Sequence, residues 1–262
     1  RKIYKGLSLP SFLRPTAQKA EVLAVTGVSK NFGGIQAVRH AGLSLSSREI
    51  HALIGPNGAG KTTLFNLISG RFAPTEGTVR LLGREIQGMD PADICHAGLA
   101  RSFQITNLFE GLTIEENLRL SAQAKHPARY NFWRDIDHYD DINADTAELM
   151  KFLGLEGIED TKAGDLSYGG QRLVDLGIAL ATKPQVILLD EPLAGLAAAE
   201  RERVGNLVKT MSENIPVLIV EHDIDRILGF SHEVTVMNDG QVLVSGKPEE
   251  IRSNRLVQEI YT

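Results

Sequence analysis

A glycine-rich turn between an apolar run and a helical segment constrains this chain more than any other feature. Residues 55–63 read Gly-Pro-Asn-Gly-Ala-Gly-Lys-Thr-Thr and directly follow the apolar run 50–54. A strand, a glycine-rich turn and a helix in this order are the context of a phosphate-binding loop. Gly55, Gly58 and Gly60 would let backbone N–H groups point at phosphate oxygens, where a Cβ would crowd the ligand. The sequence therefore predicts that this turn binds the phosphates of a nucleotide.

Two side chains of the turn carry the predicted chemistry. Lys61 would reach the β- and γ-phosphates, and the Thr62 hydroxyl would bind Mg²⁺. The residues expected to contact the nucleotide are Gly55, Pro56, Asn57, Gly58, Ala59, Gly60, Lys61, Thr62 and Thr63.

A second apolar run, residues 186–189, ends in two acids. It is typical of a buried parallel strand, and it would deliver the Asp190 carboxylate to the metal at its carboxyl end. Glu191 follows directly. Such a pair suits hydrolysis, because one acid can hold Mg²⁺ while the other polarises a water molecule.

Further motifs follow in a fixed order, and with them the chain resembles the ATP-binding subunit of ABC transporters over roughly residues 22–252. Residues 166–171 read Leu-Ser-Tyr-Gly-Gly-Gln and resemble the family's signature. Gln104 ends Ala-Arg-Ser-Phe-Gln, which is similar to the glutamine loop, and His222 follows an apolar strand as the switch histidine does. Phe32 stands where the family has the aromatic residue that stacks on adenine. The resemblance implies that the ligand is ATP.

The resemblance also implies that two such domains complete each other's site. Ser167 and Gly169 of one chain would cap the γ-phosphate bound by Lys61 of the other, and Gly170 and Gln171 would belong to the same contact. The residues that follow read as a helix, and backbone N–H groups at a helix start suit an anion.

Catalytic roles carry over by position. Glu191 would be the general base, His222 would contact the γ-phosphate, and Gln104 would touch Mg²⁺ or the water. The implied metal-binding set is Thr62, Gln104 and Asp190. Closing and reopening of the pair would drive a membrane partner between states, through differential affinity for ATP.

Two positions depart from the family's commonest pattern. Tyr168 stands in the signature where many relatives have glycine, and it resembles a subfamily in which that place varies. Ala197 stands where many relatives carry an aspartate, in a segment that lies across the dimer in the family. We therefore expect that all residues needed for hydrolysis are present, whereas communication between the two ATP sites is altered.

The subfamily suggests the solute. Residues 100–104, 108–109 and 194–196 look like those of branched-chain amino acid importers, whose relatives also import urea and other small polar compounds. The implied partners are a second ATPase copy or a homologous subunit, permease subunits and, indirectly, a periplasmic solute-binding protein. The implied location is the cytoplasmic face of the inner membrane, at its periphery. Two alternatives remain: export of lipopolysaccharide, and a soluble ABC-type ATPase acting on DNA or ribosomes.

Composition limits these choices. A net charge of −5 and a pI near 5.8 argue against a nucleic-acid-binding surface as the main function. The single cysteine, Cys95, permits no internal disulfide. No apolar run approaches the roughly 20 residues that cross a bilayer, so membrane contact would go through a partner or another part of the parent protein.

We expect residues 1–20 to be a flexible basic segment, because they hold five cationic residues and no acid. This is either the cytoplasmic link of a permease–ATPase fusion or an ordinary tail or tag remnant. Residues 21–262 would form the ATPase domain, with a helical lobe at about 106–164.

The expected fold is α/β: a P-loop ATPase core with a mainly parallel sheet, an antiparallel β subdomain and an inserted α-helical lobe. The expected elements are antiparallel strands within 22–45, a strand at 77–83, parallel strands at 186–189 and 216–221, a hairpin at 234–245 and a helix starting at Pro248.

Overall fold

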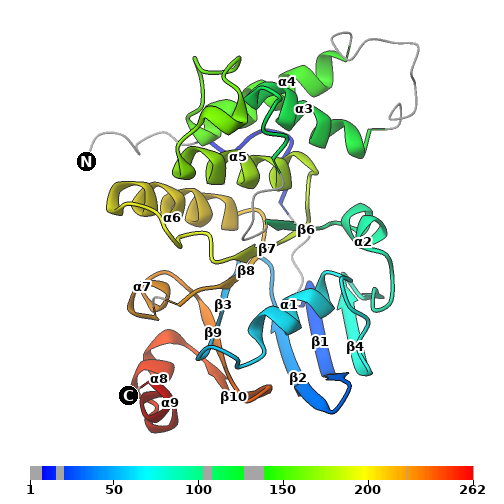
Figure 1. The fold of residues 1–262 in the computed structure, drawn as a ribbon, viewed down its shortest axis with the longest axis vertical. Helices are drawn as coiled ribbons and strands as arrows, with labels where there is room; N and C mark the ends of the chain where they lie inside the picture. The colour runs from blue at the N-terminus through cyan, green and yellow to red at the C-terminus, as the bar shows by residue number, and fades with distance from the viewer. Residues whose placement is uncertain (1–7, 16–20, 103–107, 127–138, 223, 262) are drawn as a thin grey trace. The chain divides into compact units, whose positions relative to one another are not determined.

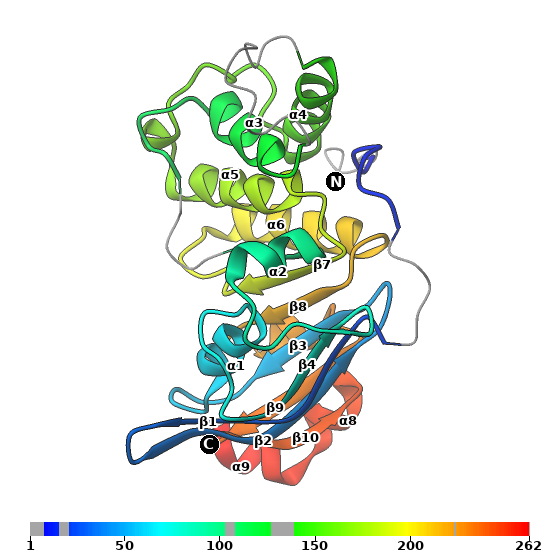
Figure 2. The same ribbon diagram turned by 90° about the vertical axis from the view of Figure 1, so that its right-hand side faces the viewer.

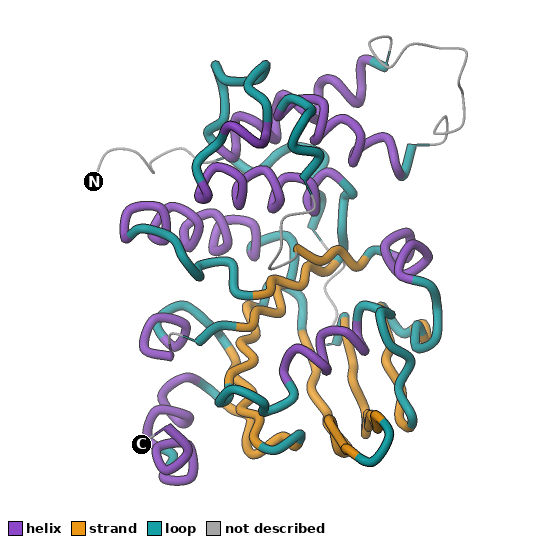
Figure 3. The backbone as a smooth tube through the Cα atoms, in the orientation of Figure 1, coloured by secondary structure: helices purple, strands orange, loops and turns teal. Residues whose placement is uncertain are grey.

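The computed structural model describes residues 8–15, 21–102, 108–126, 139–222 and 224–261 (Figure 1). The chain forms two compact units. The first comprises Arg1–Arg14, Ser102–Pro184 and Pro192–Met211, and the second comprises Pro15–Arg101, Gln185–Glu191 and Ser212–Thr262. Helices dominate the first unit and strands the second (Figure 3). The domain limits expected from the sequence remain predictions.

The second unit contains a six-stranded sheet in the order β10-β9-β3-β8-β7-β6. Its strands are β3 (Ile50–Ile54), β6 (Leu99–Ser102), β7 (Val186–Asp190), β8 (Val217–Val220), β9 (Glu233–Asn238) and β10 (Gln241–Gly246). β3 pairs in parallel with β8 and β9, β7 pairs in parallel with β8, and only the pairing of β9 with β10 is antiparallel among the registers described. Residues of β3, β7 and β8 are buried throughout, as expected for parallel strands covered on both faces. The predicted mainly parallel sheet is confirmed, and so is the predicted hairpin.

A four-stranded antiparallel sheet in the order β2-β1-β4-β5 belongs to the same unit (Figure 2). Its strands are β1 (Leu23–Phe32), β2 (Ile35–Leu45), β4 (Glu76–Leu81) and β5 (Arg84–Glu85). The predicted antiparallel strands near the N-terminus are confirmed. α1 (Lys61–Ile68) buries Phe65 and its apolar neighbours in a core shared with residues of both sheets. The unit is completed by α2 (Pro91–Ala97), α7 (Ile224–Leu228), α8 (Pro248–Ser253) and α9 (Arg255–Tyr261).

The first unit is built from α3 (Ile114–Ala124), α4 (Asp140–Leu153), a 3₁₀ turn at Ala163–Asp165, α5 (Tyr168–Ala181) and α6 (Ala198–Ser212). α3 begins at a capping box: the Thr113 hydroxyl accepts from the Glu116 N–H, and the Glu116 carboxylate accepts from the Thr113 N–H. At Gly177 of α5 a Cβ would lie 2.6 Å from a methyl carbon of Leu153 and 2.7 Å from one of Leu118, so a larger residue would push the helices apart. Helical structure is thus confirmed for the described parts of the predicted lobe.

Residues 8–14, which belong to the predicted flexible basic segment, contact other residues of this unit. The Ser11 hydroxyl donates to a carboxylate oxygen of Glu148 at 2.9 Å, and Leu13 is 2% exposed. The Lys183 ammonium lies 5.3 Å from the centre of the Phe12 ring. A buried apolar side chain and a polar contact thus link the described part of this segment to the rest of the unit, and its flexibility stays a prediction. Among the described helices, none is both long and apolar enough to cross a membrane.

Candidate nucleotide-binding site

Three adjacent parallel strands bring the predicted catalytic residues of the second unit to one edge of its sheet. The glycine-rich turn leaves the carboxyl end of β3, Asp190 ends β7, and His222 lies just beyond β8. Since β8 pairs with both β3 and β7, these three ends are neighbours. Ligands of open α/β sheets bind at this edge.

The backbone of the turn requires glycine at two positions. Gly60 has φ +97°, and a Cβ there would lie 2.7 Å from the Ala37 carbonyl oxygen. A Cβ on Gly55 would lie 2.2 Å from the Met237 carbonyl oxygen. Real Cβ atoms do not approach oxygen so closely, so the turn reaches this shape only because both positions lack side chains. The chain here is packed on β2 and β9 as a preformed loop.

The Lys61 side chain lies back over the turn that carries it. Its ammonium donates to the carbonyl oxygens of Gly55 at 2.7 Å and Pro56 at 2.9 Å, and the residue is 5% exposed. Burial lowers the pKa of Lys61 below its ordinary value, and the nearby carboxylates of Glu191 and Asp190 offset this only in part. The site therefore holds a cation in a poorly solvated position, where it would interact strongly with a phosphate.

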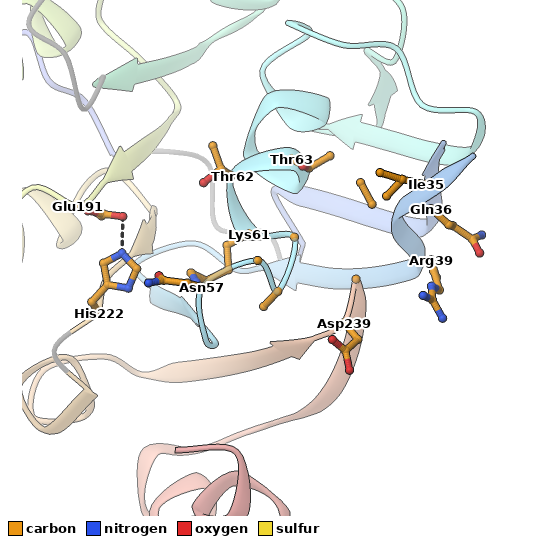
Figure 4. A pocket seen from close by; sticks show the side chains of 15 residues that line it. Ile35, Gln36, Arg39, Asn57, Lys61, Thr62, Thr63, Glu191, His222 and Asp239 are labelled. Atoms are coloured by element: carbon orange, nitrogen blue, oxygen red, sulfur yellow. Dashed lines mark hydrogen bonds and ion pairs between the residues drawn. The ribbon is translucent and has the colours of Figure 1, made fainter. Parts of the chain in front are cut away.

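A cavity of about 560 Å³ opens around this lysine. In Figure 4, His222 and Glu191 lie on one side of Lys61, and Gln36 and Arg39 on the other. The lining residues are Ile35, Gln36, Ala37, Arg39, Asn57, Gly58, Ala59, Gly60, Lys61, Thr62, Thr63, Glu191, His222, Asp239 and Gly240. Most of the predicted phosphate-binding residues, with Glu191 and His222, thus face one cavity.

Sequence reasoning missed the residues that line the cavity from β2 and from the β9–β10 turn. The backbone N–H of Arg39 donates to the Gly240 carbonyl at 2.7 Å, which ties the two segments together. Gln36 and Asp239 lie nearby in the lining. No local motif marks these residues, because only the packing of two distant hairpins brings them to the site.

Glu191 and His222 form a direct contact at the cavity wall. The His222 Nε2 lies 2.5 Å from the Glu191 Oε1, and the side chains are 47% and 14% exposed, respectively. Glu191 has φ +49°, although its backbone N–H still donates to the Val220 carbonyl at 2.9 Å. A left-handed conformation at a non-glycine residue costs energy and is frequent at active sites. With this backbone conformation, Glu191 lines the cavity.

The Asp190 carboxylate is bound by Arg101, which sequence reasoning names only as part of the motif Ala-Arg-Ser-Phe-Gln. The Arg101 Nη2 donates to the Asp190 Oδ2 at 2.8 Å, and the two side chains are only 6% and 4% exposed. The Arg101 Nη1 also donates to Asn66 Oδ1 at 2.7 Å and to Ser69 Oγ at 2.9 Å. Burial lowers the pKa of Arg101, against the opposing effect of Asp190. The available signal was an arginine that directly follows the apolar residues Leu99 and Ala100, since an arginine needs a partner when buried.

The oxygen set fits a magnesium ion. Thr62 supplies an exposed hydroxyl in the cavity wall, and Asp190 supplies a carboxylate at the end of β7. Hard oxygen ligands of this kind, few in number, are what Mg²⁺ takes from proteins when it binds together with phosphates. Gln104, the third predicted metal-binding residue, lies outside the described residues.

Phe32 lies at the end of β1 and is not in the cavity lining. It exposes 41% of its surface. Its ring packs edge-on against Phe72 with 5.3 Å between centres, and the Lys30 ammonium lies 5.2 Å from the ring centre. The exposed ring could still stack on a base, and its role in adenine binding stays a prediction.

The predicted signature residues belong to the first unit. Ser167 caps α5, its hydroxyl accepting from the Gly170 N–H at 3.2 Å. Gly169 is buried, and the Gln171 side-chain amide is 3.4 Å from the Ala163 carbonyl oxygen. These residues therefore form the start of a long helix, as predicted from the sequence.

Comparisons with known proteins agree with this geometry. The family model described as "ABC transporter" matches residues 38–194. The high-affinity branched-chain amino acid transport ATP-binding protein BraF of Pseudomonas aeruginosa is 37% identical over 92% of this chain and 97% of its own. A nucleotide-free ATP-binding cassette from an ABC transporter has a TM-score of 0.82 at 33% identity, over 92% of this chain and 99% of that one.

A dimeric ATP-binding cassette in a post-hydrolysis state, bound to ADP and phosphate, has a TM-score of 0.74 at 27% identity. The alignment covers 86% of this chain and 98% of that one. Together with the residues of the cavity, these likenesses show that the chain belongs to the ABC transporter family, as an ATP-binding, ATP-hydrolysing subunit.

Proposed function

We propose that this chain hydrolyses magnesium-bound ATP in the cavity at the ends of β3, β7 and β8, and that hydrolysis drives solute transport through a membrane permease. One observation carries the proposal. A buried lysine, a strained glutamate and a histidine in contact with that glutamate line the same cavity of about 560 Å³. Phosphoryl transfer to water needs this combination of charge neutralisation and positioning.

Lys61 would exchange its present partners for the nucleotide. Its ammonium now donates to the Gly55 and Pro56 carbonyls, which belong to the turn that would surround the phosphates. Rotation of the lysine side chain would move these hydrogen bonds to β- and γ-phosphate oxygens. Bound Mg²⁺ would neutralise charge on the same oxygens, held by Thr62, Asp190 and Gln104.

Glu191 and His222 would position the attacking water. Glu191 accepts the proton that the water loses as it bonds to the γ-phosphorus. His222 already lies 2.5 Å from the Glu191 carboxylate, so it can orient this acid and contact the γ-phosphate. The bond between the γ-phosphorus and the bridging oxygen breaks, and ADP and phosphate leave.

A second copy, or a homologous subunit, would complete the site. Ser167 and Gly169 at the start of α5 would cap the γ-phosphate held by the partner's P-loop, with Gly170 and Gln171 beside them. The dimeric relative bound to ADP and phosphate supports this arrangement. The start of α5 supplies backbone N–H groups suited to an anion.

The transported solute is proposed to be a branched-chain amino acid or a related small polar compound. The name of the relative from Pseudomonas aeruginosa supports this. Permease subunits would then hold the chain at the cytoplasmic face of the inner membrane, and a periplasmic binding protein would deliver the solute. Binding of Mg²⁺ together with ATP in the cavity is also part of the proposal.

Substitution of Lys61 tests the ATPase assignment. Lys61→Ala should abolish ATP hydrolysis, while Lys151→Ala, which removes an exposed lysine of α4, should leave it unchanged. Phosphate release at saturating ATP is the measurement. Undiminished turnover in Lys61→Ala would contradict the proposal.

Uptake measurements test the solute. A strain in which the parent gene is deleted should lose uptake of radiolabelled leucine, and the gene carrying Lys61→Ala should fail to restore it. Normal leucine uptake in the deletion strain would refute leucine as the solute without affecting the ATPase assignment.

A further inference from the structure

The signature turn rests on a carboxylate of its own chain. Gly169 is buried, and a Cβ at this position would lie 2.2 Å from Oε1 of Glu200. The Glu200 carboxylate therefore packs directly against the Gly169 Cα. The proposed contact between Gly169 and the γ-phosphate bound by a second copy does not explain why Glu200 of the same chain packs on this glycine.

The same carboxylate fixes the start of α6. Glu200 Oε2 accepts a hydrogen bond from the Ala197 backbone N–H at 3.1 Å. The carboxylate thus joins the first residues of α6 to the first residues of α5. Negative charge near the start of both helices is favourable, because their N-termini carry partial positive charge.

Tyr168 makes a second link between the same two segments. A Cβ on Gly195 would lie 3.0 Å from the Tyr168 Cε1, so the ring lies close to the Gly195 backbone. The Tyr168 hydroxyl accepts from the Arg172 Nε at 3.1 Å and Nη2 at 2.8 Å. Arg172 is 5% exposed, which anchors this end of the ring. Tyr168 itself exposes 46% of its surface.

We propose that Tyr168 and Glu200 are positioning residues, which hold the signature turn 166–170 against the segment 195–200 so that Ser167 and Gly169 are preorganised to cap the γ-phosphate of a second copy. This inference rests on the function proposed above. Hydrogen-bond donors stabilise an anion most when they need no reorganisation. Two links, one through a carboxylate and one through a ring, connect the adjacent residues Tyr168 and Gly169 of the turn to the two ends of the segment 195–200.

The test compares truncating substitutions with conservative ones, all placed in a Glu191→Gln background, which should retain bound ATP because it lacks the proposed general base. Glu200→Ala removes the carboxylate, whereas Glu200→Gln still offers an oxygen to the Ala197 N–H. Tyr168→Gly removes the ring, whereas Tyr168→Phe keeps it beside Gly195. Sedimentation velocity gives the dissociation constant of the dimer at saturating ATP, and calorimetry at low protein concentration gives the ATP affinity of the monomer.

We expect each truncation to weaken the ATP-dependent dimer about tenfold, because misplacing a turn that binds a phosphate has effects of this order or larger. ATP affinity of the monomer should stay within about twofold, and the conservative variants should dimerise within about threefold of the background chain. A purely structural defect would instead lower ATP affinity and dimerisation together.

Two results would overturn the inference while leaving the proposed function intact: dimerisation equal to background in both truncated variants, or a parallel loss of monomer ATP affinity. If the background Glu191→Gln chain itself fails to dimerise with ATP, the two-chain site is wrong and the inference falls with it.

Discussion

Removing Arg101 should destabilise the fold strongly, because its partner would remain as a buried charge. The Arg101 and Asp190 side chains are 6% and 4% exposed, and their charged atoms lie 2.8 Å apart. Loss of one partner of such a pair costs about 3–5 kcal/mol. A domain of this kind is stable by about 5–15 kcal/mol, so Arg101→Met should remove a large part of its stability.

The double variant Arg101→Met/Asp190→Leu separates the burial cost from the value of the pair. Replacing both partners with apolar residues of similar size is often close to neutral. We therefore expect the double variant to be more stable than Arg101→Met alone. Some cost should remain, because Asn66 also loses the hydrogen bond that it accepts from Arg101.

Urea denaturation followed by circular dichroism measures these differences, provided that the transitions have equal slopes. The matched control is Arg80→Met, because Arg80 and Glu85 lie at the same 2.8 Å separation with half of each side chain exposed. Solvent screens that pair, so its loss should change stability little. A loss of less than about 1 kcal/mol in Arg101→Met would refute the reasoning, since it would mean that the buried pair is solvated like an exposed one.

Other predictions concern the turn and the helical unit. ATP affinity should fall as pH rises toward 10.5, because burial lowers the pKa of Lys61 below that value and the ATP-free site loses its positive charge before an ordinary lysine would. In the same pH range the free energy of unfolding should rise, because Lys61 is protonated in the unfolded chain but deprotonated in the folded one. Calorimetry across this pH range measures the ATP affinity, and in Lys61→Arg the affinity should depend less on pH, because arginine keeps its charge. An equally steep fall in that variant would show that a group other than Lys61 is titrating. Gly60→Ala should abolish ATP binding and lower stability by about 1–3 kcal/mol, because its Cβ would meet the Ala37 carbonyl at 2.7 Å. Gly58 has φ +82°, but no atom lies within 4 Å of a Cβ added there, so Gly58→Ala should lower stability only through backbone strain. An equal loss of stability in Gly58→Ala and Gly60→Ala would show that the steric contact at Gly60 is unimportant. Thr113→Ala should cost about 1 kcal/mol through loss of the α3 cap, seen as a lower urea midpoint, and an unchanged midpoint would contradict the capping assignment.

Local chemistry explains why much of this site could be predicted from sequence. The turn at 55–63 needs glycine for steric reasons and lysine for charge, so sequence and geometry coincide there. Apolar strands that end in Asp190 or lead to His222 place those residues at one sheet edge, because parallel strands share a direction. In a parallel sheet, a residue's place at the end of its strand in the sequence thus predicts where it lies in the structure.

Contacts between distant segments were beyond the reach of such reasoning. Nothing near Arg101 in sequence shows that it meets Asp190, Asn66 and Ser69, and nothing near Gln36 shows that β2 lines the cavity. The basic composition of residues 1–20 likewise gives no sign that Leu13 is buried and that Ser11 bonds to Glu148. In each case a tertiary contact overrides the local pattern.

Several charged groups in or next to the cavity are paired within the chain, and this affects how the site would bind ATP. Lys61 donates to two carbonyls, Asp190 is joined to Arg101, and Glu191 to His222. Binding would therefore exchange one set of hydrogen bonds for another, and only the difference contributes to affinity. A lysine with no partner would bind a phosphate more tightly but would also release the products more slowly. Under the proposed function, internal pairing of these residues would favour turnover over tight retention of the nucleotide.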